Sequence, residues 1–364
     1  MKSGKSVYEK NNRSARAILF ALLAAALFGV CSPASKLLLA ELPPALLAAL
    51  LYLGAGFGML LVKIARPFGK REQTEAGMTK KELPYAAAMI LLDIGAPILL
   101  MAGLTMTNAS TASLLINFEI VATSAIAMVF FREFLDKRMW LAILLITVSC
   151  VILSVEDFRS LSLSVGSILV LGACLCWGIE NNCTRMLSMK DPLQIVIIKG
   201  FGSGTGALLI ALAAGGYSGG IQIGSFLSIL LALLLGFVSY GLSIFLYIAA
   251  QRELGAARTS IYYAAAPFIG VLISWIVLRD PITGSFLIAL AIMLTGTYFA
   301  ITENHRHKHI HTEETHEHRH RHDDGHHNHS HDDGFSGEHS HEHTHEALEH
   351  THSHTPELHH RHRH

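Results

Sequence analysis

Charged residues are scarce in this sequence. Asp, Glu, Lys and Arg make up only 15% of its 364 residues, and 51% are hydrophobic, whereas about a quarter of the residues of a soluble domain are charged. This composition argues against an ordinary soluble protein. The sequence also lacks a Gly-rich phosphate loop and an H-E-x-x-H zinc motif, which are signatures of enzymes. We therefore expect the protein not to be an enzyme, and we expect no nucleic-acid partner.

Histidine is absent from the first 304 residues, because all 23 histidines lie between His305 and His364. The chain thus joins two regions of different composition. The five cysteines all fall in apolar runs, so they do not form the pattern of a disulfide framework in a small secreted domain. We expect them to be reduced and buried among apolar helices.

Long apolar runs are abundant. A bilayer core is roughly 30 Å thick, so a helix needs about 20 mostly apolar residues to cross it. Continuous apolar runs indicate helices, because in lipid every backbone polar group must be paired within its own segment or in a closed barrel. The sequence predicts an all-α integral membrane protein with ten spans, at residues 16–40, 45–63, 84–106, 109–131, 139–155, 164–187, 193–214, 225–250, 260–278 and 282–302.

Lysine and arginine are distributed unevenly between the two sides of the predicted membrane. With the N-terminus in the cytoplasm, the cytoplasmic segments hold 18 of these residues, and the outer loops hold only Arg159 and Arg279. Because cytoplasmic loops are enriched in Lys and Arg, we predict that both termini are cytoplasmic. The predicted location is the plasma (inner) membrane.

The chain contains an internal repeat. A shift of 147 residues aligns Asn108–Ser113 with Gly255–Ser260, and Arg132-Glu133 with Arg279-Asp280. Each half supplies five spans, and an odd number means that the second copy crosses the membrane in the opposite direction. We predict four regions: a cytoplasmic N-terminal segment (1–15), two inverted five-helix repeats (16–155 and 156–302) and a disordered cytoplasmic tail (303–364).

Several segments resemble the EamA type of the drug/metabolite transporter superfamily. They are NASTASLLINFEI and FFRE in the fourth span, GAARTSIYYAAAPFIGVLISWIVLRDP in the second half, and the repeat openings ALFGVCSPASK and CLCWGIENNCTR. The resemblance implies a ten-helix inner-membrane carrier that moves small metabolites, often outward. The Glu-Pro pair usual in the family's fourth and ninth helices is divided here, as Glu119-Ile120 and Ala266-Pro267. One intramembrane acid remains where the repeat symmetry allows two.

Ionisable side chains at membrane depth are the candidate functional residues, because each one costs about 2.5–3.5 kcal/mol on insertion scales. We predict that Glu119 is a proton or substrate site, since burial disfavours a charged carboxylate. The alternative is a helix-contact residue, hydrogen-bonded through Asn117 or a neighbouring helix. Asp93 is a second candidate, or it lies at a helix kink made by Pro97. Lys36 either lines the pathway or extends to the membrane interface.

The sixth predicted span has the densest polar cluster, which includes Glu180 and Asn181. We interpret these two residues as a polar wall of a substrate pathway. Tyr263 lies just inside the ninth predicted span and faces the acid-bearing region of the fourth by repeat symmetry. We therefore expect Tyr263 to line the same cavity.

The tail has a composition that cannot bury a core, so we expect disorder. Neutral imidazoles bind zinc, nickel, cobalt or copper, which makes the tail a candidate metal binder. A metal sensor, a metal store and a pH-responsive charged segment all remain open. The candidate ligands follow an H-x-H pattern: His305, His307, His309, His311, His316, His318, His320, His322, His339, His341, His343 and His345.

The sequence favours a secondary transporter that exports a small organic metabolite by alternating access, with proton coupling as an option. The alternative is a divalent metal transporter (Zn, Ni or Co) whose cytoplasmic tail collects or senses the ion. We expect partners to be a small-molecule substrate and the lipid bilayer, and we expect no required cofactor. Substrate, direction, coupling ion and a homodimeric state stay open at this point.

The uneven distribution of basic residues predicts the topology. A reporter fused after Thr302 should give a cytoplasmic signal, and one inserted at Gly219 should give an external signal, because ten crossings return the chain to the cytoplasm. Paired alkaline phosphatase and green fluorescent protein fusions measure this. An external signal from the fusion after Thr302 would show that one span has been miscounted.

Overall fold

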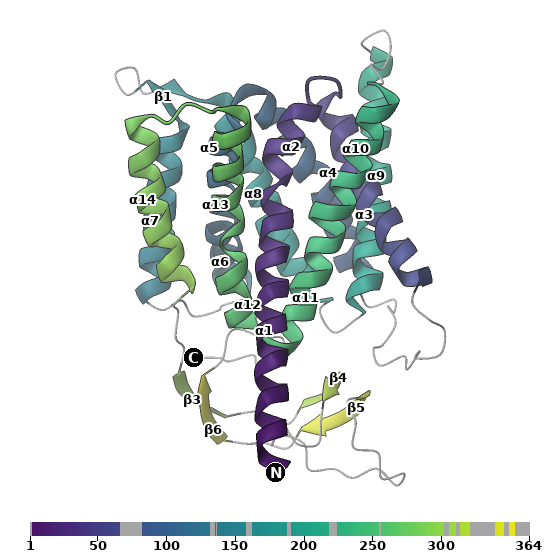
Figure 1. Cartoon of the computed structure of the whole chain (residues 1–364), viewed down its shortest axis with the longest axis vertical. Coiled ribbons are helices and arrows are strands. Elements are labelled where there is room, and N and C mark those ends of the chain that lie inside the picture. Colours follow the sequence, from purple (N-terminus) through teal and green to yellow (C-terminus); the bar gives the residue numbers. More distant parts are fainter. Residues whose placement is uncertain are drawn as a thin grey trace.

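The described part of the chain is a bundle of helices that lie roughly side by side (Figure 1). The computed structural model describes residues 2–65, 82–131, 135, 137–157, 162–187, 191–217, 224–254 and 256–301, with the side chains of 2–14 and a few others left out, and the backbone of 306–310, 314–320, 339–345 and 349–353.

The helices divide into a first and a second half. The first half contains α1 (Lys2–Gly29), α2 (Cys31–Leu38), α3 (Pro44–Ala65), α4 (Leu83–Met106), α5 (Ala109–Leu115), α6 (Phe118–Phe131) and α7 (Lys137–Ser154). A short antiparallel pair, β1 (Val155–Asp157) and β2 (Ser162–Leu163), joins the halves. The second half contains α8 (Val165–Arg185), α9 (Pro192–Tyr217), α10 (Phe226–Gly236), α11 (Ser243–Leu254), α12 (Ala256–Tyr263), α13 (Ala266–Ile273) and α14 (Gly284–Ile301), with π-helical segments η2 (Phe237–Leu242) and η3 (Ser274–Leu278).

Nine helical stretches in the described residues are long and apolar enough to span a membrane. The ninth span predicted from the sequence is not among them, and its helix is interrupted between Tyr263 and Ala266. Its second part, Ala266–Leu278, is a shorter apolar helix. Pro267 lies in the first turn of that part, where its missing N–H leaves no intrahelical bond unmade.

The same interruption occurs in the first half, where α5 ends at Leu115 and α6 begins at Phe118. The repeat offset of 147 residues carries this break onto the break between α12 and α13 to within one residue. Each half therefore contains a helix that is interrupted at the equivalent position. Discontinuous helices at corresponding positions are a feature of transporters built from inverted repeats.

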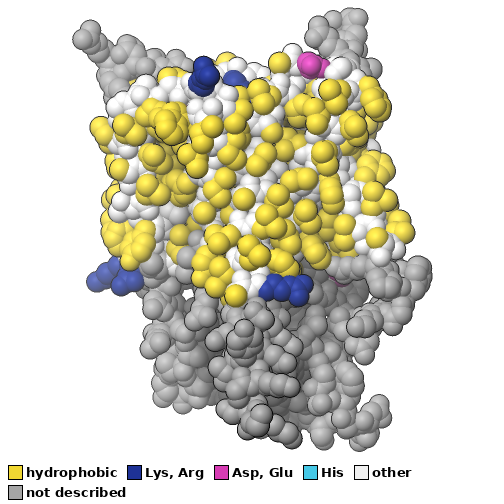
Figure 2. Space-filling view, viewed as in Figure 1, with side chains coloured by type: hydrophobic (Ala, Val, Ile, Leu, Met, Phe, Trp, Pro, Cys, Tyr) yellow, Lys and Arg dark blue, Asp and Glu magenta, His cyan; other side chains and the backbone are white. Residues whose placement is uncertain are grey.

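The outer surface of the bundle is apolar. Phe226 and Phe130 are among its most exposed side chains, at 81% and 76%. Figure 2 shows hydrophobic side chains over most of one face, with Lys and Arg gathered toward its ends. An apolar band of this kind, bounded by charge, is the surface that a bilayer covers. The protein is a multi-pass membrane protein.

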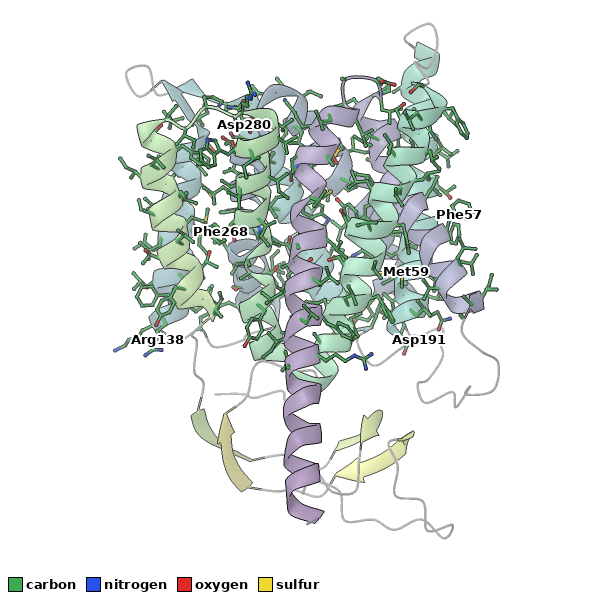
Figure 3. All side chains as sticks on the ribbon, in the orientation of Figure 1. Phe57, Met59, Arg138, Asp191, Phe268 and Asp280 are labelled. Carbon is green, nitrogen blue, oxygen red and sulfur yellow. The ribbon has the colours of Figure 1, made fainter. Side chains whose placement is uncertain are left out.

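Two acidic side chains join the halves at the end of the bundle that carries Asp280 (Figure 3). Asp280 Oδ2 accepts a hydrogen bond from the backbone N–H of Ser110 at 2.8 Å, in the first turn of α5. Glu41 Oε2 accepts from the hydroxyl of Ser225 at 2.7 Å and from its backbone N–H at 3.3 Å. These hydrogen bonds hold the pKa of Glu41 below its usual value.

The tail contains four short strands, where its composition predicts disorder. β3 (Arg306–Ile310) pairs antiparallel with β6 (Glu349–Ser353), and β4 (Glu314–His320) pairs antiparallel with β5 (His339–His345). The H-x-H alternation has the period of a strand, which explains why extended backbone suits these segments. Two-stranded ribbons have little independent stability in water, so the composition alone gave no reason to expect them.

Close backbone contacts hold α3 against α10. A Cβ added to Gly54 would collide with the carbonyl group of Leu233, and one added to Gly236 would collide with that of Leu51. Only glycine lets these two helices approach so closely, as in other membrane helix pairs.

The contact between α3 and α10 predicts the effect of adding a methyl group. Gly54→Ala and Gly236→Ala should each lower the free energy of unfolding by about 1–3 kcal/mol, the usual range for overpacking. Gly95→Ala is the matched control, because a Cβ there meets nothing within 4 Å, and alanine favours a helix by up to about 1 kcal/mol. Thermal unfolding in detergent measures the three variants. Equal destabilisation of all three would contradict this account of the packing.

Candidate functional site

An ion-paired cluster lies inside the bundle. Lys199 Nζ of α9 is 3.0 Å from Asp93 Oδ2 of α4 and 3.0 Å from Glu180 Oε1 of α8. The Asp93 and Glu180 side chains are 0% and 2% exposed, and that of Lys199 is 16% exposed. We call these three residues the acid–lysine cluster. With all three ionised, its formal charge is −1.

Hydroxyl groups from two helices complete the cluster. Tyr52 of α3 donates a hydrogen bond to Asp93 Oδ1 at 2.9 Å, and Thr184 donates to Glu180 Oε1. Asp93 Oδ2 lies 3.0 Å from the Lys199 ammonium and has no other donor among the described residues. A carboxylate oxygen can accept more than one hydrogen bond, so Oδ2 keeps acceptor capacity in the protein interior.

Local sequence explains part of this arrangement. Asp93 precedes Pro97 by one helical turn, and Pro97 lies inside α4 without interrupting it. Proline has no N–H for the carbonyl oxygen of Asp93, so α4 has reduced backbone pairing at the residue that carries the acid. Asp93 is thus both a member of the acid–lysine cluster and the residue opposite a proline.

Glu119 forms a second polar centre next to the acid–lysine cluster. It lies in the first turn of α6, directly after the break in the helix. Asn181 Nδ2 donates to Glu119 Oε1 at 2.6 Å and to Thr123 Oγ1 at 3.2 Å. Asn117 instead donates to the carbonyl oxygen of Leu114 at 3.1 Å. The hydrogen-bond partner of Glu119 is thus on a neighbouring helix.

Helix α8 connects the two centres. Its consecutive residues Glu180 and Asn181 bind Lys199 and Glu119 respectively. Three carboxylates, one ammonium group and one amide are therefore brought together from α4, α6, α8 and α9. This combination is the candidate functional site, because ionisable groups at this depth are costly and mark substrate or proton pathways in membrane proteins.

A row of aromatic rings leads away from the acid–lysine cluster. Ring centroids are 5.1 Å apart for Tyr52 and Tyr240, 6.1 Å for Tyr240 and Phe28, 5.9 Å for Phe28 and Tyr263, and 4.9 Å for Tyr263 and Tyr247. We call these five residues the aromatic row. The row connects α3, η2, α1, α12 and α11, and its last member, Tyr247, is hydrogen-bonded to Ser260 at 3.1 Å.

The other predicted site residues lie elsewhere or outside the described side chains. Lys36 Nζ donates to the carbonyl oxygens of Leu104 and, at 2.8 Å, Thr107, so it satisfies the end of α4 rather than joining the central site. It also lines a surface pocket of about 450 Å³. The side chains of all twelve predicted histidine ligands, His305 to His345, lie outside the described part of the structure.

Sequence reasoning did not assign a role in the site to Lys199 or Tyr52. Lys199 was identifiable as a lysine within an apolar span, but nothing in the sequence showed that it pairs with Asp93 and Glu180 from two other helices. Tyr52 carries no signal at all, because tyrosine is common in membrane helices, mostly at the interfaces.

The shared ammonium group predicts how the site responds to its loss. Lys199→Met should lower the free energy of unfolding by about 3–5 kcal/mol, the range for removing one partner of a buried ion pair. Adding Asp93→Asn and Glu180→Gln to Lys199→Met should recover most of the lost stability, because the cluster then holds no uncompensated charge. Thermal unfolding at neutral pH measures both proteins. A triple variant no more stable than Lys199→Met would contradict the charge balance described here.

The comparisons with known proteins agree with the helical bundle and its internal repeat. The chain is 27% identical to an uncharacterized transporter from Methanothermobacter thermautotrophicus over 285 residues, which cover 74% of this chain and 82% of that protein. A protein of solved crystal structure has the same fold, with a TM-score of 0.54 and 17% identity over 78% of this chain and 95% of the other.

The model of the EamA-like transporter family matches the chain twice, at residues 15–155 and 164–302. The two matches fall on the two halves, each containing one broken helix. The resemblance noted from the sequence and the all-α membrane fold class are thus confirmed. The chain belongs to the EamA-like transporter family.

Proposed function

We propose that the protein is a proton-coupled secondary transporter that exports a small organic metabolite by alternating access. Membership of a transporter family supports transport itself. The observation that carries the coupling is the sharing of the single Lys199 ammonium by Asp93 and Glu180 in the protein interior. The outward direction is supported by the resemblance to the family, whose members often export metabolites.

The charge balance of the site gives the coupling its physical basis. Asp93, Glu180 and Glu119 bring three carboxylates to a region where the described side chains offer the one ammonium of Lys199. Burying an uncompensated charge in a low-dielectric interior is strongly unfavourable. The empty site is therefore stabilised by protons, and a bound substrate can take their place. Alternation of proton and substrate at the same groups is what couples their movement.

The two interrupted helices support an alternating-access cycle in which this exchange takes place. Glu119 lies in the first turn of α6, directly after the turn that separates α6 from α5. The equivalent break in the second half is close by, because α13, which begins at that break, packs against α5, which ends at the first one. Helix breaks near the midplane, one in each inverted half, are where transporters of this architecture bind and release solutes.

The alternative of a divalent metal carrier has less support in the described core. Within the described residues, no group of three or more His, Cys, Asp or Glu side chains is arranged to hold a metal ion. The carboxylates of Asp93 and Glu180 already hold the Lys199 ammonium. The organic-solute hypothesis is the one that the geometry favours.

Proton coupling predicts the behaviour of neutral substitutions. Glu119→Gln should lower accumulation driven by a pH gradient by at least about tenfold, while exchange of saturating solute without a gradient continues, because a proton site is lost and Asp93 and Glu180 still bind the solute. Proteoliposomes with an imposed pH gradient and a metabolite panel measure both activities. The control is Asp191→Asn, which removes a carboxylate at the start of α9 but keeps a residue that caps helices.

Two results would contradict the proposal. Unaltered gradient-driven uptake by Glu119→Gln would exclude Glu119 as a proton site. Equal losses in Asp191→Asn and Glu119→Gln would show that the effect is general damage to the protein.

A further inference from the structure

We infer that the cargo of the central site is an organic cation, an ammonium group attached to an apolar or aromatic body. This inference rests on the proposed function and adds the chemical class of the substrate. It depends on three features of the described residues: the sign of the charge in the site, the fixed position of Lys199, and the aromatic row.

The sign of the charge favours a cation. The central site holds Asp93, Glu119 and Glu180 against Lys199, which gives a formal charge of −2 when all four are ionised. A monocationic solute reduces this excess on binding, whereas an anionic solute increases it. Like charges brought together at low dielectric repel by several kcal/mol.

Lys199 offers an anion little net attraction. Its ammonium group lies 3.0 Å from a carboxylate oxygen on each side, so a substrate carboxylate would meet two negative charges together with the one positive charge. An incoming ammonium group is attracted by the net negative charge and shares the two carboxylates with Lys199. Asp93 Oδ2 has the Lys199 ammonium as its one neighbouring donor among the described residues, and it can accept a further hydrogen bond from the N–H of an ammonium.

The aromatic row suits the rest of such a molecule. It begins at Tyr52, which is bonded to Asp93 itself, and continues over consecutive centroid distances of 4.9–6.1 Å to Tyr247. Tyr247 belongs to α11, which ends near the start of α12, at the end of the bundle that faces the tail strands (Figure 1). Ring faces attract cations by about 0.5–2 kcal/mol each and also accept apolar groups. A row of rings that ends at an acid is a suitable path for an amine.

Compounds with one skeleton and different charges test this inference. The full-length protein in detergent is titrated, by calorimetry, with phenethylamine, phenylalanine and 3-phenylpropionate, which share a phenylalkyl body and carry a cation, a zwitterion and an anion. Indolylethyl and butyl series of the same design repeat the test with a larger and a smaller body. In at least one series, the amine should bind at least about tenfold more tightly than the carboxylate.

Variants connect the binding to the proposed site. Glu119→Gln and Glu180→Gln should each weaken binding of the amine by about tenfold, and Asp191→Asn should leave it unchanged. Tyr263→Leu should weaken the aromatic amine more than butylamine, because only the former contacts rings through its body. If a variant fails to fold in detergent, Glu119→Asp, which keeps the charge, should retain binding within a fewfold.

The outcomes separate this inference from the proposed function. Tighter binding of a carboxylate or zwitterion, or no saturable binding by any amine, would overturn the cationic cargo. If a pH gradient nevertheless drives accumulation of such a zwitterion or anion in proteoliposomes, the proposal of proton-coupled transport is retained and only the cationic cargo is rejected. If an amine binds as expected but no pH gradient moves it, the cargo class stands and proton coupling fails.

Discussion

The arrangement of the interior depends on one constraint: two buried carboxylates share a single ammonium group. Asp93, Glu180 and Lys199 come from three different helices, α4, α8 and α9, so each helix must keep its rotation and depth for the charges to remain paired. The surrounding packing serves this constraint, since Tyr52 holds the remaining oxygen of Asp93 and Asn181 extends the polar contacts to Glu119. A buried network with a net charge is stable only when another positive group, a proton or a ligand, completes it.

Much of the fold was predictable because lipid imposes simple rules on sequence. Apolar runs of sufficient length gave the spans, and the offset of 147 residues gave the repeat. The break in the ninth predicted span was not predicted, although Pro267 was visible, because a proline in the first turn of a helix and one inside a continuous helix look alike in sequence. Pro97 shows the second case, since α4 continues through it.

The site was predictable only in part. Glu119, Asp93 and Glu180 were found because a carboxyl group at membrane depth is costly enough to need a reason. Their partners were not found, since pairing depends on the contact of helices that are distant in the chain. The aromatic row illustrates the same limit: Phe28, Tyr52 and Tyr240 are ordinary residues of apolar runs, and only the packing of five helical segments brings their rings together.

Infrared difference spectroscopy of the reconstituted protein tests the central claim most directly, because it detects the protonation of individual carboxyl groups. The account predicts the absorption of a protonated carboxylic acid in the empty protein, its loss when a cationic solute binds, and its absence from the variant with Asp93→Asn, Glu119→Gln and Glu180→Gln. A signal that persists in this variant, or that no solute changes, would show that the proton resides elsewhere and would contradict the account.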